Sequence, residues 1–305
     1  MRRILITGAT GFLGTHLTRR LAGSGGEVFA VRRSEQQDRD INLHGDGVMP
    51  VYTDGTFESA ERTIRELHPD TVFHLASWAG EATTAADSQR VIEANFVVGV
   101  QWLEALRHSR HECVFVNAGS FWQFRPGDPP IPNSLYAAAK QAFQAMLPWY
   151  MANSAIRSTT LVLYDLYGPF DWRGKLWQRL LEATPGEVIA LSEGNQLIEL
   201  VYVSDAVRAL IHAAQLLHLS TALESHYAVD SGNRQPLRKL VQEFLQCAGK
   251  HLRVDWGRLP QTPLTILTPW TGPRLPGWAP ETSLQAGVSE TLATLGRTVP
   301  AGVTK

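Results

Sequence analysis

The sequence predicts an α/β protein built on a doubly wound parallel sheet, with a smaller C-terminal α+β lobe. Three observations support this fold class. Apolar runs of strand length alternate with amphipathic helical segments over about the first 170 residues, the pattern of a parallel sheet covered on both faces. A glycine-rich turn joins the first run to the first helical segment. After Tyr167-Gly168-Pro169 the alternation loosens, and tryptophan and proline become frequent.

The first part of the chain supplies three expected strands. Residues 3–7 form a short apolar run ended by glycine, which is typical of a buried strand in a parallel sheet. Residues 11–22 are expected to form a helix, because their leucines recur at helical spacing and glycines follow them. Residues 27–33 and 48–54 are the second and third expected strands, and 56–67 is an amphipathic helix.

The alternation continues through the middle of the chain. Residues 70–77 are expected to be the fourth strand, and a long helix follows around 88–109. Residues 113–120 are the fifth strand. A helix then opens within 133–143, and residues 158–169 carry the sixth strand.

This pattern also predicts the domain organisation. Residues 1–170 form the main domain, and 196–218 return to it as a short strand and a helix. Residues 171–195 and 219–305 form the smaller lobe, expected to bind the substrate.

Composition limits the classes of function. The net charge of -1 over 305 residues gives no field that would favour nucleic acid or an anionic membrane. Two distant cysteines exclude a disulfide framework, and no apolar run is long enough to span a bilayer, which indicates a soluble, cytoplasmic protein. No cluster of His, Cys, Asp or Glu has metal-ligand spacing, so no metal is expected.

The turn at Thr7-Gly8-Ala9-Thr10-Gly11-Phe12-Leu13-Gly14 has the form of a dinucleotide-binding loop. It follows a predicted strand and precedes a predicted helix, which is the context that this Rossmann-type motif requires. The first glycine permits a tight turn, the second a close approach of backbone to the pyrophosphate, and the third close helix–strand packing. The helix N-terminus then offers free N–H groups to the phosphates.

The end of the second strand bears on which cofactor binds. An NAD site usually has Asp or Glu there, accepting from the ribose 2′-hydroxyl. This chain has Arg32, Arg33 and Ser34 instead, which suit the 2′-phosphate of NADP better than NAD. Solvated charges at a strand end are the alternative. Asp54 is placed to accept from an adenine amino group, or to serve as a turn residue.

A tyrosine and a lysine stand four residues apart in the segment that opens at Asn133. This spacing places Tyr136 and Lys140 on one helical face, with Asn133 or Ser134 positioned to cap the helix. The pair is either incidental or a proton donor beside a cation. Such a cation would favour the phenolate and lower the tyrosine pKa.

Taken in order, these segments resemble the extended short-chain dehydrogenase/reductase family of nucleotide-sugar epimerases, dehydratases and ketoreductases. The resemblance covers about residues 1–215 and includes VFHLAS, EANFVVGVQWLEAL, LYDLYGP and LVYVSDAV. It implies a Rossmann domain with a lobe that binds a sugar nucleotide, and a homodimer. The catalytic residues that it implies are Tyr136, Lys140 and Ser120, and the cofactor-binding residues are Gly8, Thr10, Gly11, Phe12, Leu13, Gly14, Arg32, Arg33, Ser34, Asp54, Leu75, Ala76, Asn95, Tyr136 and Lys140.

The chain departs from the family pattern at two places. Phe121 and Trp122 follow Ser120 where 4,6-dehydratases have an Asp–Glu pair, and neither can carry a proton, which argues against dehydration. Asp165 stands where the family often has asparagine. The expected substrate-binding residues are Trp122, Asp165, Arg173 and Lys175; core packing and a solvated loop are the alternatives for Trp122 and for the two cations.

The sequence therefore predicts an NADPH-dependent reductase of a nucleotide-linked 4-keto-6-deoxyhexose. An NAD-dependent epimerase, which would take a hydride and return it, is the main alternative. A reductase of a polyketide or aromatic ketone also stays open, because nine tryptophans are available to line an apolar pocket. A binding protein that senses NADP without catalysis is the fourth interpretation.

Overall fold

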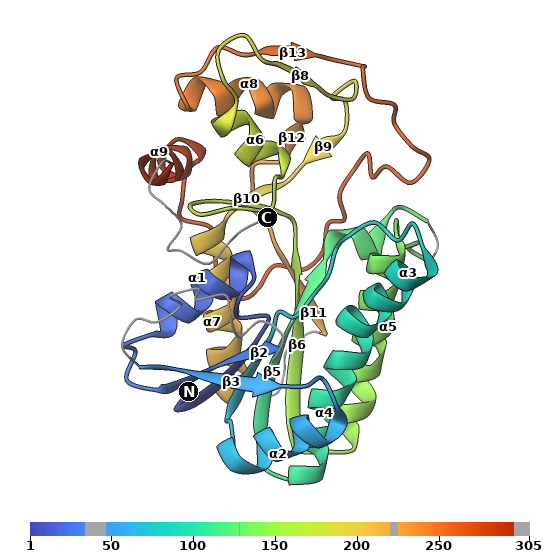
Figure 1. Ribbon diagram of the computed structural model, residues 1–305, viewed down its shortest axis with the longest axis vertical. Helices are drawn as coiled ribbons and strands as arrows, with labels where there is room; N and C mark the ends of the chain where they lie inside the picture. Colours follow the sequence, from blue (N-terminus) through green and yellow to red (C-terminus); the bar gives the residue numbers. More distant parts are fainter. Residues whose placement is uncertain (34–46, 128, 220–224, 296–305) are drawn as a thin grey trace.

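The computed structural model describes residues 1–33, 47–127, 129–219 and 225–295. Its centre is a sheet of seven parallel strands in the order β11-β6-β5-β4-β1-β2-β3 (Figure 1). The order reverses between β1 and β4, so a crevice opens there at the carboxyl ends of the strands. The strands are β1 (Arg3–Thr7), β2 (Glu27–Arg33), β3 (Val48–Thr53), β4 (Thr71–His74), β5 (Cys113–Ser120), β6 (Ile156–Leu163) and β11 (His226–Val229).

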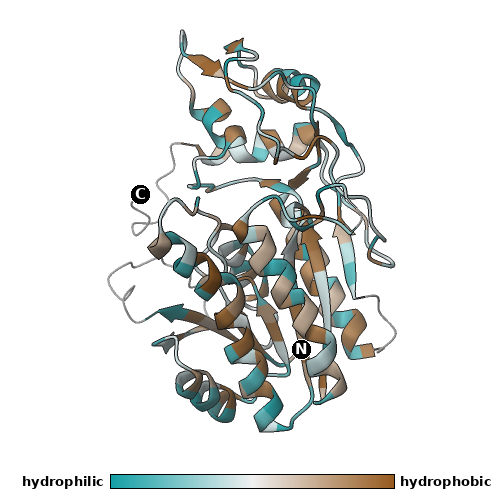
Figure 2. Ribbon diagram, turned by 90° about the vertical axis from the view of Figure 1, so that its right-hand side faces the viewer, coloured by the Kyte–Doolittle hydropathy of each residue, from teal (hydrophilic) through white to brown (hydrophobic). Residues whose placement is uncertain are grey.

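Helices cover both faces of this sheet, as the doubly wound prediction requires. α1 (Phe12–Leu21) and α7 (Val203–Leu219) bury their apolar sides on one face. α2 (Phe57–Leu67), α4 (Val98–Ser109) and α5 (Leu135–Ala152) cover the other, where they form a second core with residues of β4 and β5. In Figure 2 the strands between these layers are predominantly hydrophobic, while the helices carry both colours. The α/β prediction is thus confirmed.

The smaller lobe lies above the sheet in Figure 1 and has its own core. It contains α6 (Leu176–Glu182), α8 (Leu237–Cys247) and α9 (Leu284–Thr294). Two short strand pairs complete it: β8 (Val188–Ala190) with β13 (Arg253–Asp255), and β9 (Leu197–Ile198) with β12 (Gln235–Pro236).

The structure differs from the sequence prediction at three strands. The expected sixth strand is divided at Tyr164: β6 stays in the main sheet, whereas β7 (Asp165–Tyr167) pairs with β10 (Leu200–Tyr202). β11 lies within the segment assigned to the smaller lobe, yet it pairs with β6 as an edge of the main sheet. β4 ends at His74, so residues 75–77 continue beyond the strand.

The expected long helix around 88–109 contains an irregular stretch. α3 (Ala85–Ile92) leads into a π-helical turn, η2 (Glu93–Val97), before α4 begins. Such turns occur frequently at functional sites. No helix among the described residues has the length and apolar content needed to cross a membrane.

Two leucines test whether the lobe core supports the fold. Leu240 on α8 is 2% exposed and belongs to the lobe core, while Leu219 at the end of α7 is 85% exposed. We expect Leu240→Ala to lower the free energy of unfolding by about 2–5 kcal/mol, because it leaves a cavity. Leu219→Ala, the same chemical change, should lie within about 0.5 kcal/mol of wild type. Urea denaturation measures both; equal effects would contradict this assignment of the core.

Candidate active site

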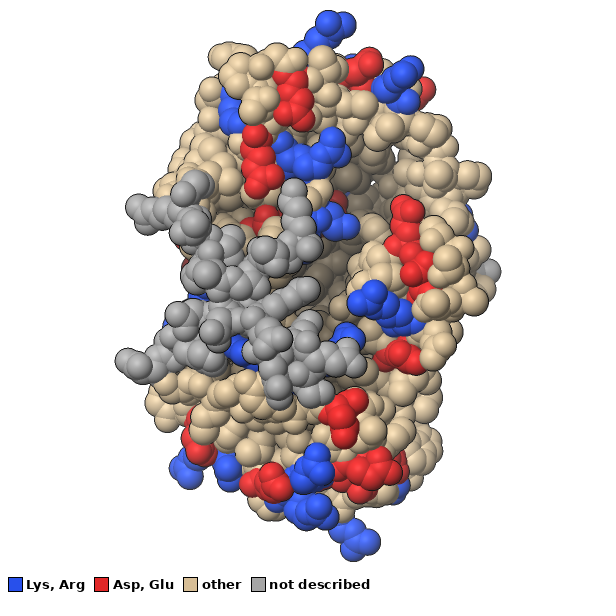
Figure 3. Space-filling view, in the orientation of Figure 1, with Lys and Arg blue, Asp and Glu red and all other residues tan. Residues whose placement is uncertain are grey.

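A cavity of about 900 Å³ lies at the switch point between β1 and β4. The ends of β1 to β4 and the start of α4 surround it. Figure 3 shows the surface hollowed between the main domain and the smaller lobe, with cationic side chains at its rim. Eight of the predicted cofactor residues line the cavity: Gly8, Thr10, Gly11, Arg32, Arg33, Asp54, Leu75 and Ala76.

The glycine loop is packed too closely to hold larger residues. Gly8 has φ +68°, and a Cβ there would lie 2.6 Å from the backbone of Leu75 and Ala76. A Cβ on Gly14 would lie 2.1 Å from the Gly8 carbonyl oxygen, so the helix can approach the loop only with glycine at this position. Phe12 and Leu13 are buried in the core beneath the loop and do not line the cavity.

The N-terminus of α1 faces this loop with its donors uncapped. Gly11 is the N-cap residue and has no side chain to accept from the first turn. The helix therefore offers N–H groups and the positive end of its dipole toward the cavity. The glycine cradle and this helix end fit the pyrophosphate of a dinucleotide, so the residues present fit an NAD(P) cofactor.

The far end of the cavity carries the residues expected at the adenosine. Arg33 is exposed at the end of β2, and Arg32 is buried beside it. Asp54 accepts hydrogen bonds from the Thr56 N–H and hydroxyl at 2.9 and 2.7 Å. Ser34 lies outside the described residues.

Helix α5 brings the predicted tyrosine and lysine together. Ser134 caps this helix, accepting from the Ala137 N–H at 3.2 Å, so the second of the two cap candidates is confirmed. Lys140 Nζ lies 5.7 Å from the centre of the Tyr136 ring and donates to the Ala118 carbonyl of β5 at 2.8 Å. Ser120 ends β5 two residues beyond Ala118, and its hydroxyl lies near enough to Tyr136 to act on the phenol pKa, so the three predicted catalytic residues lie together at the end of β5.

Burial governs the protonation of this group. It raises the pKa of Tyr136, and the neighbouring hydroxyls of Ser77 and Ser120 oppose that rise. Burial also lowers the pKa of Lys140 to about 8. The expectation that Lys140 brings the tyrosine pKa below its ordinary value is therefore wrong for this structure, because desolvation of the phenolate outweighs the other effects.

Ser77 is a site residue that the sequence interpretation did not single out. It lines the cavity and donates to Asn95 Oδ1 at 2.9 Å, and its hydroxyl acts to lower the pKa of Tyr136. Asn95 lies in η2, away from the cavity wall, and supports the loop that carries Ser77. The sequence could have identified Ser77 by its position, because it follows a predicted parallel strand that lies beside the strand ending at Ser120.

His74 lies close to this group but has a structural environment. Its Nδ1 is 2.9 Å from the Thr7 hydroxyl, and its ring packs against Phe115 and Phe143. Burial and the neighbouring Lys140 lower the pKa of His74 to about 3, so the ring is neutral.

The four predicted substrate residues occupy different environments. The Trp122 ring meets the Tyr136 ring edge to face at 5.9 Å. Burial raises the pKa of Asp165 to about 6, against the opposing charges of Lys175 and Arg173. Lys175 is exposed at the start of α6.

Arg173 is already engaged within the chain. Its guanidinium pairs with Asp171 at 2.7 Å, donates to the Leu166 carbonyl at 2.8 Å, and lies 4.2 Å from the Phe12 ring centre. These contacts tie the segment after β7 to the start of α1. They account for Arg173 without a substrate, while its role toward substrate stays a prediction.

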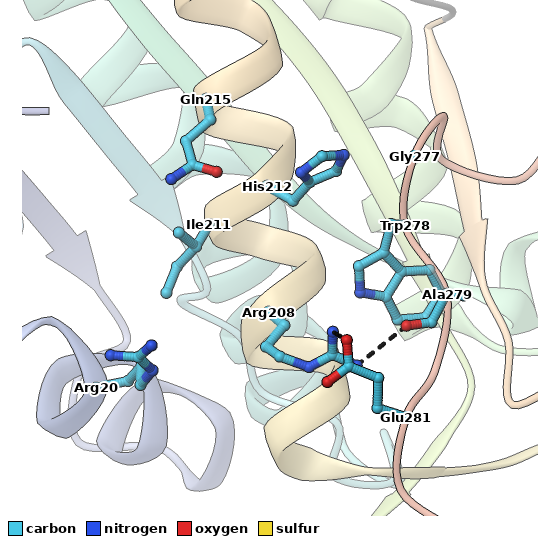
Figure 4. A pocket seen from close by; sticks show the side chains of 9 residues that line it. All are labelled: Arg20, Arg208, Ile211, His212, Gln215, Gly277, Trp278, Ala279 and Glu281. Carbon is cyan, nitrogen blue, oxygen red and sulfur yellow. Dashed lines mark hydrogen bonds and ion pairs between the residues drawn. The ribbon is translucent and has the colours of Figure 1, made fainter.

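A second, smaller pocket lies between α1, α7 and the segment 277–281 (Figure 4). Arg208 in this pocket pairs with Asp205 and Glu281, each at 2.7 Å. His212 contacts the Pro276 carbonyl at 2.8 Å. These groups satisfy one another, and the described residues of the pocket include no glycine loop or helix N-terminus of the kind that lines the first cavity.

Comparison with protein families identifies the group to which this site is similar. Residues 4–224 match the model of the NAD dependent epimerase/dehydratase family. CDP-abequose synthase of Yersinia pseudotuberculosis is 30% identical over 212 residues, which cover 69% of this chain and 72% of that protein. dTDP-4-dehydro-6-deoxy-D-allose reductase of Streptomyces bikiniensis is 25% identical over 291 residues, covering 87% and 88% of the two chains.

Solved structures show the same architecture. UDP-glucose 4-epimerase of Thermus thermophilus, determined in complex with NAD, superposes with a TM-score of 0.77. It is 26% identical, and the match covers 96% of this chain and 98% of that one.

Lys140 offers a test of the cost of building this site. Its side chain is nearly fully buried, with a pKa of about 8 against an ordinary 10.5. At pH 7, below both values, folding must desolvate the charged amine. We therefore expect Lys140→Met to raise the free energy of unfolding by about 3 kcal/mol, less the contribution of the lost bond to Ala118.

The gain in the free energy of unfolding of Lys140→Met over wild type should shrink as the pH rises from about 8 to 10.5. In this range the folded wild-type protein carries the neutral amine, whereas the unfolded chain still binds the proton, so wild type becomes more stable as the pH rises. Urea denaturation at pH 7 and at pH 10 measures it. A variant that is less stable than wild type at both pH values would contradict the assigned cost of burial.

Proposed function

This chain belongs to the NAD-dependent epimerase/dehydratase family, and we propose that it is an NADPH-dependent ketoreductase. Its proposed substrate is a 4-keto-6-deoxyhexose linked to a nucleotide. The observation that carries this proposal is the grouping of Tyr136, Ser120 and Lys140 at the end of β5, next to Ser77 of the cofactor cavity, with aromatic side chains at the next two positions after Ser120.

The bound nicotinamide would supply the hydride for reduction of the ketone. Tyr136 gives its phenolic proton to the oxygen of the reduced carbonyl. Ser120 orients that oxygen: its own Oγ accepts from the Trp122 N–H at 3.3 Å, which leaves the hydroxyl proton available to donate. Lys140, held by the Ala118 carbonyl, keeps a positive charge close to the phenol as the phenolate forms.

The aromatic residues after Ser120 separate reduction from dehydration. Removal of water requires an acid and a base at the sugar, and Phe121 and Trp122 supply neither. Phe121 stacks on Tyr164 at 5.4 Å, and Trp122 meets Tyr136. The Streptomyces relative is named as a reductase of a nucleotide-linked 4-dehydro-6-deoxyhexose, which supports the same class of substrate here.

The choice between the two nicotinamide cofactors rests on the end of β2. Arg33 is exposed there and lines the cavity with Arg32, in place of an acidic residue. A guanidinium in this place favours a 2′-phosphate.

The relatives also include epimerases that bind NAD, such as the Thermus structure, so epimerisation is the second candidate. A reductase consumes NADPH in net, whereas an epimerase interconverts two sugars with no net change in the cofactor. TDP-, CDP- and GDP-linked 4-keto-6-deoxyhexoses offered with NADPH or NADH therefore separate the two activities by loss of cofactor absorbance.

Tyr136→Phe tests the assigned proton donor. The change removes one hydroxyl and should lower kcat for reduction by about 10²–10⁴-fold, because general acid catalysis is lost. Binding of NADPH, followed by fluorescence, should be unchanged. Tyr52→Phe removes the same group from a half-exposed position on β3 and should leave kcat as in wild type. Near-normal turnover by Tyr136→Phe would refute the mechanism.

Arg33→Ala tests the preference for NADPH. Loss of one charge-assisted contact to a phosphate should raise KM for NADPH by about tenfold or more. KM for NADH, measured on the same preparation, serves as the control and should change little. An equal change for both cofactors would indicate that Arg33 does not recognise the 2′-phosphate.

A further inference from the structure

We propose that Ser77 is a positioning residue for Tyr136, a second hydroxyl that supports the phenol before proton transfer and the phenolate after it. The proposal rests on the proposed function, because it concerns the proton that Tyr136 gives to the substrate. It adds to the predicted group of tyrosine, lysine and Ser120 a residue that enters from a different strand.

The pairing of β4 with β5 brings Ser77 and Ser120 to the same edge of the sheet. β4 and β5 are parallel, with His74 paired to Asn117. Ser77 and Ser120 each lie three residues beyond that pair, so the two chains deliver hydroxyls to neighbouring points. Both hydroxyls lie near enough to the Tyr136 phenol to act on its pKa.

Asn95 fixes the direction of the Ser77 hydroxyl. The Asn95 Nδ2 donates to the Trp78 and Val91 carbonyls at 2.8 and 2.9 Å, which determines the orientation of the amide. Its Oδ1 therefore faces the loop, where it accepts from the Ser77 hydroxyl at 2.9 Å and from the Trp78 N–H at 3.3 Å. The single proton of Ser77 is thus held by Asn95, and its lone pairs are left to accept from the Tyr136 O–H.

Proton transfer reverses what Tyr136 needs from Ser77: the phenol donates a hydrogen bond, whereas the phenolate accepts one. Once Tyr136 has given its proton to the substrate oxygen, its own oxygen is an anion that needs donors. A hydroxyl can rotate about its C–O bond, so Ser77 can turn its proton from Asn95 Oδ1 to the phenolate without breaking a covalent bond. Asn95 retains its bond from Trp78 during that rotation. Ser77 therefore satisfies both protonation states of its neighbour, and solvent restores the proton of Tyr136 afterwards.

Other titratable groups around Tyr136 do not supply this function. Lys140 lies on the same helix, and its amine is held by the Ala118 carbonyl. His74, on β4, is bonded to Thr7 and neutral. Arg90 and Glu93 line the same cavity from α3 and η2, where Arg90 stacks on Trp78 at 5.0 Å and Glu93 accepts from Gln89 at 2.7 Å.

A titration without substrate tests the proposal separately from the proposed function. The ultraviolet absorbance of phenolate is followed with pH in wild type and in Tyr136→Phe, and the difference gives the pKa of Tyr136. The same difference is taken in the Ser77→Ala background. We expect the midpoint to rise by about one pH unit, because a donor to the phenolate is lost. An unchanged midpoint would overturn the proposal whether or not a keto sugar is reduced.

Kinetics supply the second measurement and its controls. Ser77→Ala should lower kcat for reduction by about tenfold with KM for NADPH unchanged, and Ser77→Thr, which retains the hydroxyl, should restore most of it. Ser88→Ala removes a hydroxyl that donates to the Thr84 carbonyl on α3, outside the cavity lining, and should behave as wild type. If Ser77→Ala does not fold, Ser77→Cys replaces it, because a thiol is a weak donor of similar size.

The kinetic outcome against the proposal is also defined. A loss in Ser77→Ala that Ser77→Thr does not restore, or a rise in KM for NADPH with kcat unchanged, would show that Ser77 only shapes the cofactor cavity. If no keto sugar is reduced by wild type, the proposed function fails, and the titration alone decides the role of Ser77.

Discussion

The parallel pairing of β4 with β5 is the interaction on which the site depends. It aligns two strands that α3, η2 and α4 separate in the sequence, so that both end at the same edge of the sheet. Their extensions bring Ser77 and Ser120 to the phenol of Tyr136, and the Ala118 carbonyl of β5 receives Lys140. A shift of one residue in this register would turn Ser120 to the other face of the sheet, away from Tyr136 and Lys140.

Helix α5 must lie close to the sheet for this arrangement to hold. Ala137 and Ala139, between the tyrosine and the lysine, are buried, and their small side chains permit the close approach. That closeness desolvates both functional groups, which raises the pKa of Tyr136 and lowers that of Lys140. The geometry on which the proposed reaction depends is therefore costly to stability, a common property of active sites.

The sequence predicted the regular features because each leaves a local pattern. Apolar runs identified the strands, glycines identified the turn before α1, and spacing of four identified the Tyr136–Lys140 pair. β11 was assigned to the wrong lobe because its pairing with β6 joins segments distant in sequence, which periodicity does not report. The π-helical turn that holds Asn95, and hence the connection to Ser77, depends on side-chain contacts across two elements. The desolvation of Tyr136 likewise comes from tertiary packing, so the local sequence pattern could not predict the direction of its pKa shift.

The aromatic residues after Ser120 follow from the same packing. η3 (Phe121–Phe124) begins where β5 ends, and a capping box between Ser120 and Gln123 fixes its direction. Phe121 then stacks on Tyr164, at the break between β6 and β7, and Trp122 covers the edge of Tyr136. Trp122 against the Tyr136 ring shields part of the phenol from water, and a lower local dielectric strengthens a hydrogen bond to a charge that forms there. On the proposed reaction, the residues that remove the machinery for dehydration also provide the surroundings in which one phenol, supported by two hydroxyls and an amine, suffices for reduction.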